Sequence, residues 1–155
     1  MSVVEGTSLE YVSIIKNFLT EKYRSTTDSL EKGRLSMGYE LTKDCVCDHT
    51  IPYPSYSYDT VVDVIYLIKN DDNQIISFVL LNRETDEAPW ILYFIYTDPN
   101  YRKMGHAARL LSYVKERHGK MLAFIDGDAS ENLFSKFYVL NPGDGQFLPN
   151  VTYSS

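Results

Sequence analysis

The segment 96–111, which reads YTDPNYRKMGHAARLL, carries residue types that can bind an anion at the start of a helix. A helix N-terminus holds unpaired backbone N–H groups and a partial positive charge of about half an elementary unit. Gly105 has no side chain and Ala107 has one methyl group, so a ligand can approach the backbone, while Arg102 and Lys103 add full positive charges. The segment therefore predicts a phosphate or diphosphate site. The competing interpretation is an ordinary turn that starts a helix.

A second group of chemically active residues is Cys45, Cys47 and His49 in the segment DCVCDH. A stable zinc site needs a second pair of ligands at a suitable distance, and the chain has no further cysteine. We therefore expect no metal site, and we interpret the two thiols as structural or incidental.

The elements on either side of the basic turn follow from hydrophobic periodicity. Residues 89–97, PWILYFIYT, form a nearly unbroken apolar run, which is typical of a strand in the middle of a sheet. Apolar residues after the turn repeat at helical spacing to about His118, and residues 121–126, MLAFID, read as a short strand. A strand, a helix and a return strand form a right-handed crossover in which the two strands are parallel.

The rest of the chain supplies elements that surround this unit. A capping box and helical spacing predict a helix from about Ser8 to Tyr23. We expect a short helix and then a long loop over residues 25–58, because Gly33 and Gly38 interrupt a weak helical pattern. Two antiparallel strands, a helix and a closing strand are expected at residues 60–69, 75–82, 129–140 and 145–153. The order predicts an α/β fold with a mixed, mostly antiparallel sheet and helices on both faces.

Length and composition restrict the class of protein. A chain of 155 residues matches a single domain, 1–155, and 44% apolar with 23% charged residues is typical of a folded globular protein. The formal net charge of −6 argues against a nucleic-acid partner and favours a cationic one. The N-terminus lacks the features of a signal peptide, and no apolar run is long enough to span a membrane. We therefore expect a cytoplasmic protein with no membrane partner.

The basic turn resembles a loop found in a known family. RKMGHA, residues 102–107, is similar to the Arg/Gln-x-x-Gly-x-Gly/Ala pattern of the GNAT acetyltransferases, and it lies where that fold has the loop, between a central strand and a helix. The preceding DPNYR and the KFY of residues 136–138 extend the resemblance to about Thr60–Leu140. The resemblance implies a GNAT-like acyl-CoA N-acyltransferase fold, with acetyl-CoA as the acyl donor.

The resemblance also implies which residues bind the donor. The turn would bind the diphosphate through Arg102, Lys103, Met104, Gly105, His106 and Ala107. The strand before it would bind the pantetheine arm at Tyr96 and Thr97, and the last helix would add contacts from Asn132 and Phe137. Two positions depart from the family pattern. Asn132 is one residue out of register with the asparagine that many members carry, and Phe134 stands where they carry a small residue. Two interpretations are open: the helix is shifted by one residue, or the coenzyme-facing surface is altered and Phe134 narrows the pocket.

Catalytic residues are also carried over from the family. Tyr138 falls where members often keep a tyrosine that protonates the departing thiolate, and the alternative is a core aromatic residue. The general base is less defined, because the strand Trp90–Tyr96 contains no carboxylate. Candidate bases at its ends are Glu84 and Asp98, followed by Asp63, Asp86 and Glu87. For any single one of them, a turn, a cap or a solvated surface position is the interpretation that we favour.

The expected function is therefore an N-acetyltransferase that moves acetyl from acetyl-CoA to a primary amine by direct attack in a ternary complex. A lysine side chain, a protein N-terminus and a small-molecule amine all remain open as acceptors, with Tyr53, Tyr56 and Tyr58 as a lining for a cationic amine. The alternatives are a catalytically weak GNAT-like module that binds acyl-CoA or a protein, and an unrelated α/β binding domain. The pattern is compatible with a homodimer but does not require one.

Overall fold

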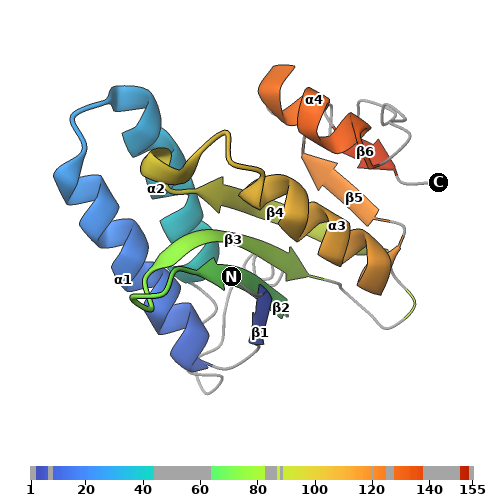
Figure 1. Ribbon diagram of the computed structural model, residues 1–155, viewed down its shortest axis with the longest axis horizontal. Coiled ribbons are helices and arrows are strands. Elements are labelled where there is room, and N and C mark those ends of the chain that lie inside the picture. Colours follow the sequence, from blue (N-terminus) through green and yellow to red (C-terminus); the bar gives the residue numbers. More distant parts are fainter. Residues whose placement is uncertain are drawn as a thin grey trace, which may run out of the picture.

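The computed structural model describes residues 3–6, 9–43, 64–82, 87, 89–119, 121–124, 128–137 and 151–153. Within them lies one six-stranded sheet in the order β1-β2-β3-β4-β5-β6 (Figure 1). The strands are β1 Val3–Gly6, β2 Val64–Lys69, β3 Ile75–Asn82, β4 Trp90–Thr97, β5 Met121–Phe124 and β6 Val151–Tyr153. The helices are α1 Leu9–Ser25, α2 Ser29–Lys43, α3 His106–His118 and α4 Asp128–Ser135, with a 3₁₀ turn η3 at Pro99–Tyr101. No helix in these ranges is long and apolar enough to cross a membrane.

The strand pairing confirms the predicted mixed sheet. Neighbouring strands from β1 to β4 are antiparallel, β4 and β5 are parallel, and β6 is antiparallel to β5. Helix α3 connects the parallel pair, as expected of a crossover. β1 is an addition to the predicted order, since it pairs with β2 at the edge of the sheet. α4 is shorter than predicted, because it ends at Ser135.

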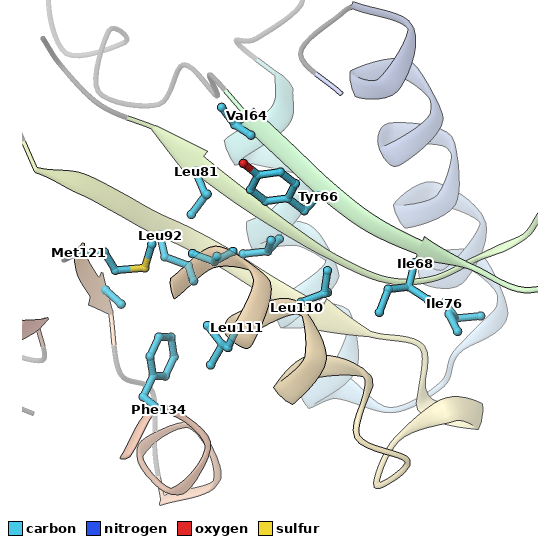
Figure 2. Packing of buried hydrophobic residues seen from close by; sticks show 13 residues of the cluster. Val64, Tyr66, Ile68, Ile76, Leu81, Leu92, Leu110, Leu111, Met121 and Phe134 are labelled. Carbon is cyan, nitrogen blue, oxygen red and sulfur yellow. The ribbon is translucent and has the colours of Figure 1, made fainter. Parts of the chain in front are cut away.

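The sheet separates two layers of core. β2 shows the reason, since alternate side chains of a strand point to opposite faces and this strand is buried on both. Tyr66 and Ile68 pack in a cluster with α3 and α4, and Figure 2 shows Phe134 of α4 packed in that cluster. Ile65 and Leu67 pack in a second cluster with α1 and α2. Helices therefore cover both faces, as the sequence predicts.

Helix α2 is longer than the sequence indicates. It runs for 15 residues through Gly33 and Gly38, so the expected short helix is wrong. At Gly38 a Cβ would stand 2.7 Å from Cε2 of Phe94, which means that glycine lets α2 approach β4 closely. Packing of this kind offsets the weak helix propensity of glycine. The remainder of the predicted loop, with its tyrosines, lies outside the described residues.

β4 contains a β-bulge. Leu80 pairs with Phe94 and Leu81 with Leu92, so Tyr93 is an extra residue on β4. The extra residue reverses the alternation of side chains: Leu92 lies in the cluster of α3 and α4, whereas Phe94 lies in the cluster of α1 and α2. The predicted strand is therefore present, but its two halves bury opposite faces.

The pairing between β4 and β5 is short. It covers only Trp90, Ile91 and Leu92, although β4 continues to Thr97. Beyond Leu92 the two strands diverge, as Figure 1 shows above the start of α3. The second half of β4 therefore presents one edge that β5 does not occupy.

Candidate functional site

The turn between β4 and α3 adopts a backbone conformation that favours glycine. Gly105, the residue before the first turn of α3, has φ 85°, and no side chain caps the helix at this end. Lys103 also has a positive φ of 64°. A Cβ added to Gly105 would meet no atom of the described chain within 4 Å, so the space in front of this glycine is open. The first N–H groups of α3 therefore face a space that a ligand can enter.

That space is part of a cavity of about 340 Å³. Its walls come from α2, the second half of β4, the turn, the start of α3, and α4: Arg34, Ile95, Tyr96, Thr97, Tyr101, Arg102, Lys103, Gly105, His106, Ala107, Ala108, Leu133 and Lys136. Two further hollows lie outside the start of α3: one between α1 and α2, and one between α1, the residues around Gln74 and the 3₁₀ turn η3.

The cavity is positively charged in a chain of net negative charge. Arg34, Arg102, Lys103 and Lys136 all line it, and no carboxylate is among the described lining residues. The chain as a whole has a formal net charge of −6. The positive lining is thus a local feature, and with the helix N-terminus it suits an anionic ligand.

Arg102 is held by three contacts. Its Nη1 forms an ion pair with Oε1 of Glu31, its Nε donates to the carbonyl oxygen of Thr97 at 3.0 Å, and its guanidinium lies 5.4 Å from the ring centre of Tyr96. The hydroxyl of Tyr96 donates to Oε2 of Glu31 at 2.9 Å. Glu31 of α2 therefore binds both the end of β4 and the start of the turn.

These contacts shift the proton affinities of the three groups. Burial raises the pKa of Tyr96, and the hydrogen bond to Glu31 raises it further, well above the ordinary value for a phenol. For Glu31, burial acts to raise the pKa, but the hydrogen bonds from Arg102 and Tyr96 outweigh it and lower the pKa below its ordinary range. At Arg102 burial acts to lower the pKa, and the interactions with Glu31 raise it overall. Glu31 and Arg102 are therefore charged at neutral pH and Tyr96 is neutral.

Asp98, a predicted candidate base, is buried and paired with other residues of the protein. It is 4% exposed, its carboxylate forms an ion pair with Lys22 of α1, and Oδ1 accepts the N–H of Asn100 at 3.0 Å. It caps η3, which matches the alternative interpretation made from the sequence. Asp98 does not line the positively charged cavity.

The free edge of β4 continues the cavity. Asp98 donates its backbone N–H to the carbonyl of Ile76 in β3 at 2.8 Å. Because N–H directions alternate along a strand, those of Ile95 and Thr97 point to the opposite edge. Ile95 and Thr97 line the cavity, and β5 does not pair with β4 at this level. An extended ligand therefore has a strand edge next to the helix N-terminus.

The predicted donor-binding residues divide into two groups. The cavity brings together seven of them: Tyr96, Thr97, Arg102, Lys103, Gly105, His106 and Ala107. Met104, Asn132 and Phe137 are not among its lining residues. Met104 is 63% exposed, and Phe137 packs against the core cluster of α3 and α4.

The other predicted residues either have a burial that can be compared with their expected role or lie outside the described residues. Phe134 is fully buried in the core, so the interpretation in which it narrows the pocket is wrong (Figure 2). Glu84 and Tyr138 lie outside the described residues, as do Asp63, Asp86 and His49. Glu87 is exposed.

Six lining residues were not among the predicted donor-binding residues: Arg34, Ile95, Tyr101, Ala108, Leu133 and Lys136. Of these, Arg34, Leu133 and Lys136 come from outside β4, the turn and the start of α3. Lys136 and Leu133 are three residues apart on the last helix and the turn after it, a spacing that places side chains on one face and that the sequence could have indicated. Arg34 had no such signal, because α2 was expected to be a short helix and nothing local connects it with the turn.

Comparisons with known proteins agree with this architecture. A family profile described as "Acetyltransferase (GNAT) family" matches residues 37–138. The chain is similar to the solved structure of a histone acetyltransferase HPA2 and related acetyltransferase from Corynebacterium glutamicum, with 14% identity, a TM-score of 0.59, and coverage of 99% of this chain and 95% of that one. It is also similar to Tetrahymena GCN5, with 11% identity, a TM-score of 0.60, and coverage of 99% and 95%. No curated protein sequence matches significantly. At such low identity the two structures support the fold alone.

Proposed function

We propose, because this chain belongs to the acetyltransferase (GNAT) family, that it transfers an acetyl group from acetyl-CoA to a primary amine. The transfer takes place by direct attack of the amine in a ternary complex, without a covalent enzyme intermediate. The observation that carries the proposal is the positively charged cavity, which joins the uncapped N-terminus of α3 to the free edge of β4.

The residues of the cavity suit the donor. The open space at Gly105 and the first N–H groups of α3 suit a diphosphate, and Lys103 and Lys136 add positive charge. The β4 edge at Ile95 and Thr97 suits the amides of a pantetheine arm, which pair with a strand as another strand does. Met104, Asn132 and Phe137 remain weaker proposals because they lie outside the cavity lining.

The proposed chemistry needs two proton transfers by this chain. Acetyl-CoA supplies an activated thioester, so a C–N bond forms as the C–S bond breaks. Tyr138 donates its phenolic proton to the leaving sulfur, since a phenol with an ordinary pKa near 10 is protonated at neutral pH. A carboxylate takes the proton from the amine, and we favour Glu84 over Asp98, because Asp98 is buried in an ion pair with Lys22.

The acceptor is a primary amine: a lysine side chain, a protein N-terminus or a small molecule. The net charge of −6 supports a cationic acceptor. We also propose that residues 1–155 act as one domain in the cytoplasm, without a nucleic-acid or membrane partner.

The first experiment measures thermal unfolding of the purified protein with acetyl-CoA, coenzyme A and ATP. Free ligand at about 100 times its dissociation constant stabilises a folded protein by about 2.7 kcal/mol, which raises the melting temperature by several degrees. We expect acetyl-CoA and coenzyme A to give a larger rise than ATP. An absence of any rise at millimolar acetyl-CoA would refute the donor assignment.

A second experiment separates an enzyme from a binding module. Acetyl transfer to amines is followed by the release of free thiol, for wild type and for Tyr138→Phe. We expect Tyr138→Phe to lower kcat by about 10²-fold or more while the dissociation constant for acetyl-CoA stays within about twofold. If wild type binds acetyl-CoA but releases no thiol with any amine, the non-catalytic module is the better description.

A further inference from the structure

We propose that Glu31 is a positioning residue for the acyl-donor site, where it holds Arg102 as a clamp beside the cavity instead of leaving it free to bind the diphosphate. The proposal rests on the function proposed above and adds a residue far from the turn in sequence. It also changes the role that the turn motif implies for Arg102.

The contacts of Arg102 restrict its side chain. The Nε group is committed to the carbonyl of Thr97 and Nη1 to Glu31, while the ring of Tyr96 lies beneath the guanidinium. The side chain of Arg102 is 34% exposed and that of Glu31 only 12%. A guanidinium held in a fixed direction by a largely buried carboxylate cannot turn to a ligand without breaking these bonds.

Glu31 is itself fixed in place. Both carboxylate oxygens are used, Oε1 by Arg102 and Oε2 by Tyr96. Glu31 lies in the first turn of α2, which Asp28 caps by accepting the N–H of Leu30 at 2.9 Å. The clamp therefore runs from a capped helix start to the end of β4 and then to the turn.

The clamp also changes the charge that the cavity presents. Because Glu31 forms an ion pair with Arg102, the positive charge of the described lining comes mainly from Lys103 and Lys136, with Arg34, which also interacts electrostatically with Glu31, on α2. Arg34 lies one helical turn after Glu31, so α2 supplies both the clamp and a cation of the cavity wall. Loss of the clamp should displace the turn and leave the cavity less able to hold an anion.

The test compares Glu31→Gln, Arg102→Gln and a control, Glu21→Gln, by calorimetric titration with acetyl-CoA. Glu21 is an exposed carboxylate on α1 outside the positively charged cavity, so the control removes the same charge without touching the clamp. We expect Glu31→Gln and Arg102→Gln each to weaken binding by about tenfold, the size expected when a hydrogen bond to a charged group is lost. The control should bind within about twofold of wild type.

The direction of the change distinguishes the two roles of Arg102. If Arg102 binds the diphosphate and Glu31 only competes for it, Glu31→Gln will tighten binding, and that result overturns the proposal. Unchanged binding in Glu31→Gln overturns it as well. The double variant should lose no more than the single variants, because both remove the same contact, whereas additive losses refute a shared clamp.

A measurement without ligand covers the case in which the proposed function fails. Melting temperatures of wild type, Glu31→Gln, Arg102→Gln and the double variant form a double-mutant cycle between Glu31 and Arg102. A coupling between the two residues supports the clamp even if wild type does not bind acetyl-CoA, and its absence refutes the clamp even if wild type binds. Tyr96→Phe, which removes only the hydroxyl donor to Glu31, is the milder variant if Glu31→Gln does not fold, and it should weaken acetyl-CoA binding in the same direction.

Discussion

Gly105 meets two requirements at one position, a positive φ of 85° and an open space where a Cβ would stand. Gly105→Ala should destabilise the fold by about 1–3 kcal/mol, because non-glycine residues rarely adopt this conformation. It should also weaken acetyl-CoA binding by about tenfold, since the new methyl group enters the space proposed for the diphosphate. Thermal unfolding and calorimetric titration measure the two effects separately. A loss of stability with unchanged binding would place the diphosphate elsewhere.

Glu31 should make stability depend on pH in the acid range. Its pKa is lowered in the folded protein, so its contribution is complete above the ordinary value of 4.5 and is lost as the pH falls through the lower folded value. We expect the gap in melting temperature between wild type and Glu31→Gln to be constant from neutral pH to about 4.5 and to shrink below it. Melting curves over a pH series measure this gap. A gap that does not change with pH would mean that Glu31 acts by packing and not by charge.

For single residues, the sequence predicts a shared site where the residues are close neighbours along the chain. Arg102, Lys103 and Gly105 follow one another in a recognisable turn, so their shared site is evident from their order. The clamp is not evident, because Glu31 and Tyr96 are 65 residues apart and neither stands out among the other charged or aromatic residues. Only the packing of α2 on β4 brings them together.

The two glycines of α2 have opposite surroundings and give opposite predictions. At Gly38 an added Cβ would stand 2.7 Å from the ring of Phe94, which is buried and stacked on Tyr96. Gly38→Ala should therefore destabilise the protein by about 1–3 kcal/mol, as overpacking of a core does. Gly33 has open space around it, and Gly33→Ala should stabilise the helix by up to about 1 kcal/mol.

Denaturant unfolding of both α2 variants provides the measurement. Each variant is a control for the other, since both replace glycine by alanine in one helix. If both stabilise the protein to the same extent, α2 does not pack against Phe94 as described, and the position of Glu31 on the same helix is in doubt as well.

The elements themselves were predicted where their pattern is strong. β3, at Ile75–Asn82, has the bounds that its run of β-branched and aromatic residues indicates, and β4 differs from its prediction by one residue. The bulge at Tyr93 could not be predicted, because an unbroken apolar run hides the reversal of the alternation. The length of α2 was also missed, because the reason for its glycines is a contact with β4 and not a local preference.

The protein has a positively charged cavity although its net charge is negative. The sheet makes this possible, because β4 diverges from β5 and opens one edge beside the start of α3. Helices on both faces then complete the walls, with Arg34 from α2 on one side and Lys136, after α4, on the other. Neither cation alone defines a site. The fold as a whole brings both side chains to the wall of the same cavity.

Binding of acetyl-CoA should therefore weaken as salt is added. The Debye length falls from about 10 Å at 0.1 M ionic strength to about 3 Å at 1 M, so exposed cations such as Lys103 and Lys136 lose much of their attraction for an anion. Lys136→Gln should weaken binding at low salt and reduce the salt dependence, because one of these charges is gone. Dissociation constants measured across this salt range by calorimetric titration test both statements.

The matched control is Lys16→Gln, which removes the same charge from α1, where Lys16 lies over the ring of Tyr39 and outside the cavity. It should keep the salt dependence of wild type, since Lys16 does not line the cavity and its exchange leaves the cations of the lining in place. If Lys16→Gln and Lys136→Gln alter the salt dependence equally, the donor responds to the net charge of the protein. In that case the arrangement of cations around the start of α3 would not determine binding.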